Sequence, residues 1–213
     1  MDLPSLDPTR LDTTHLFAIA AAMGWASGLR LYAVVFLTGL AGFLGWVPLP
    51  SGLKLLENPL VMGASALMLA VEFLADKVPG LDSIWDTLHT LIRIPAGAAL
   101  AAAVFGGDHA SWATIAALMG GTLAATSHVA KATTRAAANT SPEPFSNLAL
   151  SLAGDAVVPA MLWAAWEQPQ WFFVALALAL VAMVTVTLLL MKFLVGLVRS
   201  LRARFGGGAG APA

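Results

Sequence analysis

The stretch EFLADKVPGLDSIWDTLHTLIR, residues Glu72–Arg93, decides how the rest of this chain can be arranged. Charged residues make up only 11% of the 213 residues, yet this short interval concentrates them between two long apolar segments. Ionisable side chains are costly to place in a bilayer, so such a cluster indicates either a functional site or a set of internal ion pairs. The ionisable residues of the stretch are Glu72, Asp76, Lys77, Asp82, Asp86, His89 and Arg93.

The composition is typical of a membrane protein. Hydrophobic residues make up 59% of the chain and the mean hydropathy is +0.81, against about 45–50% apolar residues in soluble domains. Because a spanning helix needs about 20 residues, the length allows about six spans and leaves no room for a separate soluble domain. We therefore predict an all-α, polytopic membrane helix bundle whose main partner is the lipid bilayer.

Charge and cysteine content exclude several classes of protein. The net charge is −1, the pI is near 6.4 and the few basic residues are scattered, so we expect no nucleic-acid partner. The chain has no cysteine, which excludes disulfides, thiolate metal sites and a cysteine nucleophile. We expect no cofactor, and the sequence leaves open whether the protein forms a homo-oligomer.

Apolar runs separated by loops rich in proline, glycine and polar residues give the expected order of elements. A polar N-terminal segment covers residues 1–14, one transmembrane domain covers 15–204, and a low-complexity tail covers 205–213. Within the domain we expect helices at 16–47, 59–75, 81–105, 112–138, 148–166 and 171–198.

The first apolar segment is too long for a simple span. A straight helix over residues 16–47 would measure about 48 Å, against a hydrocarbon core of about 30 Å. The segment must therefore tilt, protrude or break. We expect a break or a close helix crossing at Gly24–Gly28, GWASG, because small residues let backbones approach one another.

Six crossings would place both chain ends on one side of the membrane. In that arrangement one side collects nearly all of the basic residues, while the other side has Lys54 with Glu57, Asp108 and Glu167. Positively charged loops face the cytoplasm, so we expect both termini to be cytoplasmic. The residues on the basic side are Arg10, Lys77, Lys131, Arg135, Arg199, Arg202 and Arg204.

A short sequence match suggests an internal repeat. IAAAMG, residues 19–24, is matched by IAALMG, residues 115–120, each near the start of a set of three expected helices. Two three-helix units in succession enter the membrane with opposite orientations, as in the inverted repeats of many transporters. We therefore expect an inverted repeat of residues 15–106 and 110–204, with chance similarity as the alternative, since alanine, methionine and glycine are frequent in this chain.

Asp82, Asp86, His89 and Arg93 are spaced four, three and four residues apart, so a helix places them on one face. If Asp82 lies at the membrane interface, Arg93 lies about 16 Å deeper, because a helix rises 1.5 Å per residue. We expect this stripe to face the interior of the bundle. The alternative is an interfacial amphipathic helix at 81–90, with a bend near Pro95.

Further ionisable residues lie in or beside the other expected helices. Glu72 and Asp76 are one turn apart and form either a proton or cation site or internal ion pairs. Asp155 lies within an apolar helix, which makes it a functional candidate. His128 is a candidate because a histidine side chain can titrate near neutral pH. The alternative is that it serves only as a hydrogen-bonded packing group. The basic residues available as partners are Arg30, Arg93, Lys131 and Arg135.

Four segments carry a resemblance to a known family. They are ENPL at 57–60, EFLADKVPGLDSIWDTLHTLIRIPAGA at 72–98, ATSHVAKATTR at 125–135 and SNLALSLAGD at 146–155. The chain resembles a bacterial family of small integral membrane proteins known only as a domain of unknown function, the four-thousand-one-hundred-and-twenty-sixth of its series. The resemblance implies a cytoplasmic (inner) membrane location and no established activity. In the fifth expected span, where we expect two adjacent acidic residues, this chain has Gly154-Asp155. This difference weakens any mechanism that needs two carboxylates at that position.

Three functional classes remain. The first is a small transporter or channel for a polar, anionic or zwitterionic solute, with or without proton coupling, and it predicts a water-accessible cavity converging on Arg93 and Asp155. The second is a structural or regulatory membrane subunit whose charges only pair internally. The third is a metal-dependent membrane enzyme acting on lipid phosphates, because Gly80 with Asp82 and Asp86 is similar to part of the CDP-alcohol phosphotransferase signature. The upstream portion of that signature is absent, so we expect no enzyme. The residues expected to line the solute or ion pathway are Arg30, Glu72, Asp76, Asp82, Asp86, His89, Arg93, His128, Lys131, Arg135 and Asp155.

Overall fold

A computed structural model describes residues 11–78, 80–106, 110–140 and 145–205. The regular secondary structure of these residues is entirely helical. Its elements are α1 (Thr13–Phe43), η2 (Ser51–Glu57), α2 (Pro59–Ala75), α3 (Leu81–Ala103), α4 (Ala110–Ala138), α5 (Phe145–Glu167) and α6 (Pro169–Phe205). The predicted all-α bundle is confirmed, and the element boundaries lie close to those expected from the apolar runs.

Local sequence explains where the helices begin and end. The Asp12 side chain accepts a hydrogen bond from the His15 backbone N–H, and the Asn58 side chain caps α2 in the same way through Leu60. Pro59 occupies the first position of α2, where a missing N–H costs nothing. Gly80 precedes α3 with a φ of 86°, a conformation that glycine adopts without strain.

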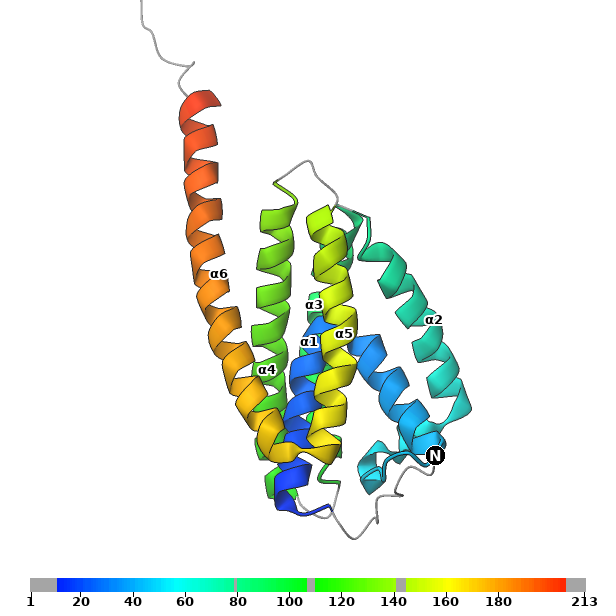
Figure 1. The fold of residues 1–213 in the computed structure, drawn as a ribbon. Coiled ribbons are helices and arrows are strands. Elements are labelled where there is room, and N and C mark those ends of the chain that lie inside the picture. Colours follow the sequence, from blue (N-terminus) through cyan, green and yellow to red (C-terminus); the bar gives the residue numbers. More distant parts are fainter. Residues whose placement is uncertain (1–10, 79, 107–109, 141–144, 206–213) are drawn as a thin grey trace, which may run out of the picture.

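The long helix α1 is broken at Arg30 and doubles back. Arg30 has φ −147° and ψ 78°, which are not helical angles. Figure 1 shows the two halves of α1 forming a V, with both open ends at the same end of the bundle. Contacts confirm this, because the Phe17 ring lies against Phe105 just after α3, while Gly52, beyond the end of α1, lies against Ala103 at the end of α3.

The doubled-back α1 changes the expected topology. Helices α2 to α6 run alternately from one end of the bundle to the other, so α1 begins at one end and α6 finishes at the other (Figure 1). The prediction that both termini lie on one side assumed that residues 16–47 cross once, and this arrangement does not confirm it. Of the described helices, α1, α4, α5 and α6 are long and apolar enough to span a membrane, and the bent pair of η2 and α2 would make five. Six spans are thus not confirmed.

The two ends of the bundle differ in chemistry. The end that holds Lys77, Arg135 and the last turns of α6 is called the basic end below. The opposite end, called the tryptophan end, holds Trp46, Trp112, Trp166 and Trp171, which lie at or beside the ends of α1, α4, α5 and α6. Tryptophans gather at membrane interfaces and basic residues on the cytoplasmic side, so we expect the basic end to face the cytoplasm.

Cysteine labelling tests this topology without background, because the chain has no cysteine. Thr14→Cys changes a residue in the first turn of α1, and Ser51→Cys changes the first residue of η2, which follows α1. Ser200→Cys changes a residue near the end of α6. We expect a membrane-impermeant maleimide applied to intact cells to label the first two variants but not Ser200→Cys, which becomes labelled only after lysis. Labelling of Thr14→Cys and Ser51→Cys from opposite sides would show instead that α1 crosses once.

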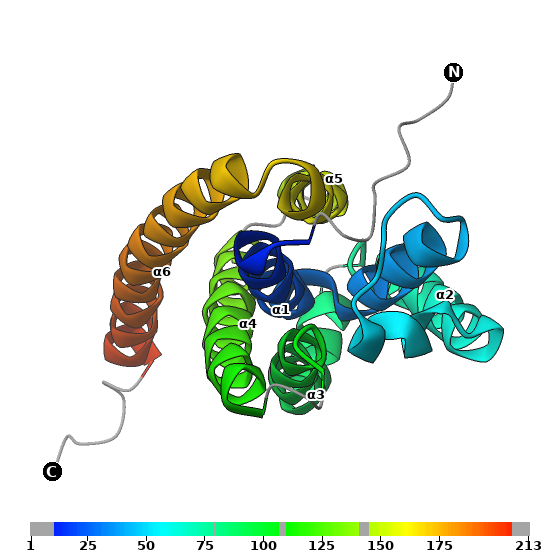
Figure 2. The same ribbon diagram turned by 90° about the horizontal axis from the view of Figure 1, so that it is seen from below.

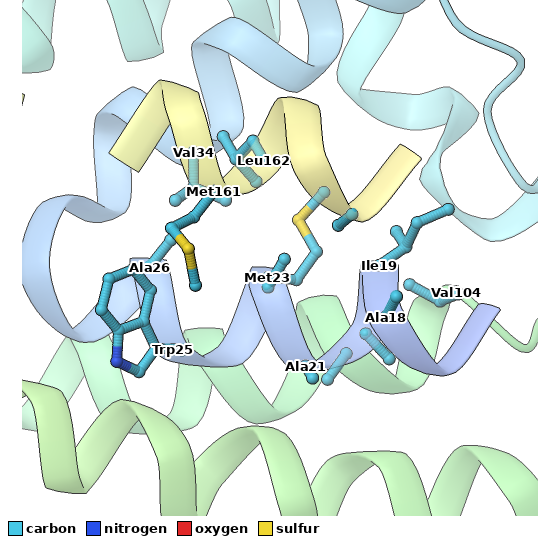
Figure 3. Packing of buried hydrophobic residues seen from close by; sticks show 14 of the residues in the cluster. Ala18, Ile19, Ala21, Met23, Trp25, Ala26, Val34, Val104, Met161 and Leu162 are labelled. Carbon is cyan, nitrogen blue, oxygen red and sulfur yellow. The ribbon is translucent and has the colours of Figure 1, made fainter. Parts of the chain in front are cut away.

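The first half of α1 is the central helix. Every residue from Ala18 to Leu31 is buried, as expected of a helix that is apolar on all sides and packed in a bundle interior. Figure 2 shows α3, α4 and α5 around it. Figure 3 shows the core that results, where Ile19, Met23 and Ala26 of α1 lie beside Met161 and Leu162 of α5.

The matching segments of α1 and α4 pack directly on one another. A Cβ on Gly24 would overlap the Gly120 backbone, and one on Gly28 would overlap Ala124 and Ser127. Contacts 24–120 and 28–124 keep the same register, so the two helices run in the same direction. An inverted repeat requires its first helices to run in opposite directions, and this prediction is therefore not confirmed. The expected close crossing at GWASG is present, while the break lies just after it.

Candidate functional site

The break in α1 presents backbone groups to the interior of the bundle. The last carbonyls of a helix have no partner within it, and α4 supplies partners for the first half of α1. The Lys131 ammonium donates to the Leu29 carbonyl at 3.2 Å, and the Ser127 hydroxyl donates to the Trp25 carbonyl at 2.7 Å. Irregular backbone at membrane depth persists only where protein or a cavity surrounds it.

Arg30 is the centre of a set of buried ion pairs. Its guanidinium lies 2.7 Å from an Asp76 oxygen and 2.9 Å from an Asp155 oxygen. It also donates to the hydroxyl and the carbonyl of Ser151 at 3.0 and 3.1 Å. Arg30 is only 2% exposed, so the break, the end of α2 and the middle of α5 meet at this one side chain.

Asp76 closes the last turn of α2 and collects three cations. Besides Arg30, its carboxylate accepts from Lys131 at 3.2 Å and lies 3.5 Å from the Arg135 guanidinium. Arg135 also donates to the Asp76 backbone carbonyl at 2.6 Å. Asp76 has no exposed surface, and this pairing compensates for the cost of burying its charge.

Arg93 organises a second group deeper on α3. Its guanidinium donates to Glu72 at 2.5 Å and to Asp86 at 2.6 Å, and it lies 3.4 Å from the His128 ring nitrogen. Lys131 joins the two groups, since it also lies 3.0 Å from Asp86. Glu72 and Arg93 have no exposed surface. Glu72 and Asp76 therefore pair with different cations in the described structure.

These ion pairs form one set, which we call the ion-pair network. Its described members include five cations and four carboxylates, so it holds one positive charge in excess. The members are Arg30, Lys77, Arg93, Lys131, Arg135, Glu72, Asp76, Asp86 and Asp155.

The two predicted histidines lie beside this network in hydrogen-bonded positions. His128 receives or donates a bond with the Thr90 hydroxyl at 2.7 Å. His89 bonds the Trp85 carbonyl and the Tyr32 hydroxyl, and its ring stacks on Trp85. Asp86, His89 and Arg93 are all buried, so α3 faces the bundle as expected and continues through Pro95. The side chain of Asp82 lies outside the described part of the structure.

Asp155 is the most accessible carboxylate of the network. Its side chain is 23% exposed, against at most 3% for the other three carboxylates that form these pairs. Its second oxygen lies 3.6 Å from the Lys77 ammonium, which also sits over the Phe73 ring. Burial lowers the pKa of Lys77, and the Asp155 carboxylate opposes that shift. Asp155 therefore has two alternative cationic partners within reach.

Two cavities meet at Arg30 and Gly154. One cavity of about 290 Å³ lies between α4, α5 and α6 and reaches Arg30, Asp76, Lys131 and Arg135. A second, of about 490 Å³, lies on the other side between the second half of α1, α2 and α5, and reaches Arg30 and Asp155. Both are lined by Gly154 as well as by Arg30. The arginine at the helix break thus separates two cavities.

The second cavity continues toward the tryptophan end. A third cavity of about 430 Å³ shares Leu37 and Pro159 with it and is lined further by Trp46, Trp163 and Trp166. The second and third cavities follow one seam, between the second half of α1 and α5, into the region of Arg30. Asp155 lines the second cavity, whereas Arg93 is buried within its ion pairs.

The carboxylates of the network are not arranged as a metal site. Among the described residues, no group of three or more histidine, cysteine, aspartate or glutamate side chains could hold a metal ion. Asp86, part of the CDP-alcohol phosphotransferase likeness, is occupied by Arg93 and Lys131, and two cations so close oppose the binding of a divalent metal.

Comparison with known proteins places the chain in a family. A family model described as a domain of unknown function, DUF4126, matches residues 17–188. The chain belongs to this family. No curated protein and no solved structure matches it. The matched range of DUF4126 includes every described member of the ion-pair network, both halves of α1 and the cavities around Arg30.

Some residues of the DUF4126 site were not among the predicted pathway residues. Lys77, Ser151, Thr90 and Tyr32 all bond to network side chains or to the histidines beside them. Two of them carried a usable signal, since Ser151 precedes Asp155 by one helical turn and Lys77 adjoins Asp76. Tyr32, the one tyrosine of the chain, and Thr90 carried none beyond their polarity.

Proposed function

We propose that this DUF4126 protein is a small membrane transporter whose solute site lies between Arg30 and Asp155. The observation that carries the proposal is the position of Arg30, which sits at the break of α1 and lines cavities on both of its sides. Broken helices place their irregular backbone at the binding sites of many transporters. Arg30 supplies a guanidinium suited to a carboxylate or phosphate group.

The exchange of ion-pair partners provides a mechanism. An anionic group of the solute replaces Asp155 at the Arg30 guanidinium, and Asp155 turns to Lys77, now 3.6 Å away. If the solute is a zwitterion, Asp155 binds its amino group instead of turning to Lys77. Protonation of Asp155 also releases Arg30, so a proton and an anionic solute can be carried together. The excess positive charge of the network favours an anion over a cation.

Opening and closing follows from the cavities. With Arg30 paired to Asp155, the ion pair separates the cavity on the α4 side from the seam that leads to the tryptophan end. When the pair opens, the two spaces join at Gly154, which has no side chain to fill the gap. The Arg93 group stays closed in this scheme and holds α2, α3 and α4 together as a fixed frame.

Flux measurements with a carboxylate-to-amide variant test the proposal. Purified protein in proteoliposomes is screened with small anions and zwitterions, with pyranine reporting internal pH. Asp155→Asn is expected to lower flux about tenfold or more, because charge-assisted hydrogen bonds contribute about 1.5–3 kcal/mol. Glu57→Gln in η2 is the matched control outside the network and is expected to keep wild-type flux.

A structural membrane subunit is the second candidate. It is favoured by the Arg93 group, where Glu72, Asp86 and Arg93 pair with one another with at most 2% exposure. Buried pairs of this kind can have a purely structural role, in which they fix how the helices pack. Equal, near-zero flux of wild type and Asp155→Asn across the whole solute panel would overturn the transporter and leave this role.

A further inference from the structure

The cavity of about 290 Å³ has two chemically different walls. On one side lie four charged residues, Arg30, Lys131, Arg135 and Asp76. Three of these four charged groups are cations, and Asp76 is already bonded by all three. The opposite wall, from α5 and α6, is formed by Leu150, Ala153, Gly154, Val157, Ala182, Met183 and Val186.

The apolar wall argues against a fully hydrophilic occupant. A polar solute body lying on valine, leucine and methionine side chains would lose its hydrogen bonds to water without replacement. A hydrocarbon chain would instead gain about 25 cal/mol for each Å² removed from water. The volume falls near the lower limit of the roughly 300–1,000 Å³ usual for ligand pockets, which suits one chain rather than two.

The position of α6 gives this cavity a side facing the bilayer. Figures 1 and 2 show α6 packed beside α4 and α5 near the tryptophan end and leaning away toward the basic end. A further cavity of about 330 Å³ lies along the same contact of α4 and α6, between Thr126 and Thr187. Large side chains of α6 such as Val181, Val184 and Leu188 are exposed around this region. An amphiphile can thus enter from the membrane.

We propose that this cavity binds a single-chain anionic amphiphile from the bilayer. Its carboxylate or phosphate lies against Arg30, Lys131 and Arg135, and its hydrocarbon chain lies along α5 and α6. The proposal rests on the transport role above and names the substrate class of the same site. The head group lies against Arg30, the residue that also pairs with Asp155 in the proposed transport site, and the apolar chain remains on the membrane side.

Binding of a fluorescent fatty acid tests the head group and the chain separately. Energy transfer from the tryptophans of the protein in nanodiscs to cis-parinaric acid reports occupancy, with protein-free nanodiscs as blank. Oleate and oleyl phosphate are expected to displace the probe about tenfold more effectively than oleyl alcohol, since one charge-assisted hydrogen bond contributes about 1.4 kcal/mol or more. Equal displacement by oleyl alcohol would overturn the proposed head-group site.

A filled cavity provides the second arm. Ala182→Phe places a ring in the cavity without removing a charge and is expected to weaken parinarate binding about tenfold. Ala177→Phe on an exposed face of α6 is the matched control and is expected to bind as wild type does. Unchanged binding by Ala182→Phe would place the probe elsewhere, and displacement by acetate or inorganic phosphate as effective as by oleate would assign the site to small anions.

Failure of this inference is distinguishable from failure of the transport role. If the wild-type protein transports small anions but does not bind parinarate, the amphiphile proposal is overturned and the transport proposal stands. The opposite result is saturable parinarate binding that Ala182→Phe abolishes, with no flux of any solute or of oleate. In that case the amphiphile site stands and the transport proposal is overturned.

Discussion

Arg93→Met is expected to lower the free energy of unfolding by about 3–5 kcal/mol, because it leaves buried carboxylates without their cation. Glu72 has no exposed surface, and Arg93 is the cation paired with it in the described structure. Asp86 keeps Lys131 at 3.0 Å, so the uncompensated charge falls on Glu72. The measurement is thermal unfolding in detergent, with the folded fraction after extraction followed by size exclusion.

A double variant separates charge from packing. Glu72→Gln combined with Arg93→Met removes the orphan charge and keeps side chains of similar volume, so we expect it to recover most of the lost stability. Replacing a buried pair by neutral groups of similar size is often neutral or stabilising. If the double variant is no more stable than Arg93→Met alone, the loss comes from packing and the charge argument is wrong. Glu57→Gln is again the neutral control.

The elements of this fold could be predicted from the sequence because apolar runs and helix-capping residues are local signals. The bounds of α2 match the prediction, and Asn58-Pro59 explains where it starts. The path of α1 could not be predicted in the same way. Its length required a tilt, a protrusion or a break, and only the contacts of both of its ends with the C-terminal end of α3 select a break that doubles back.

The expected topology, which the structure does not confirm, rested on a single assumption. Counting Leu16–Val47 as one crossing assigned the start and the end of the chain to one side, and the basic loops agreed with it. In the structure the basic residues Lys77, Lys131, Arg135 and Arg199 still share one end of the bundle. Only the side of the N-terminal region changes. The charge pattern was therefore informative, while the number of crossings was not.

The candidate site was predictable in membership but not in pairing. Charged residues in apolar helices were recognised because burying them is costly, and the described ones among them do gather in one network. Which carboxylate meets which cation depends on the rotation and depth of five helices, α1 to α5. Glu72 and Asp76 look like a pair in sequence, yet α3 supplies Arg93 to the first and the break in α1 supplies Arg30 to the second.

Gly24→Ala is expected to lower the free energy of unfolding by about 1–3 kcal/mol, as overpacking of a close contact does. A Cβ at Gly24 would overlap the Cα and the carbonyl of Gly120, and backbone cannot move aside as a flexible side chain can. Helices α1 and α4 must separate, which also disturbs Lys131 and Ser127 where they bond the carbonyls at the end of the first half of α1.

The matched control for Gly24→Ala is Gly63→Ala in α2, where a Cβ would meet nothing within 4 Å. Alanine is a better helix former than glycine by about 0.8–1.0 kcal/mol, so this variant is expected to be as stable as wild type or more stable. The same added methyl group thus has opposite effects at the two sites. Thermal unfolding of both variants in one detergent measures the difference. If the two variants are equally stable, α1 and α4 do not cross at Gly24 and Gly120. The register that places Lys131 at the Leu29 carbonyl, next to Arg30, would then be wrong as well.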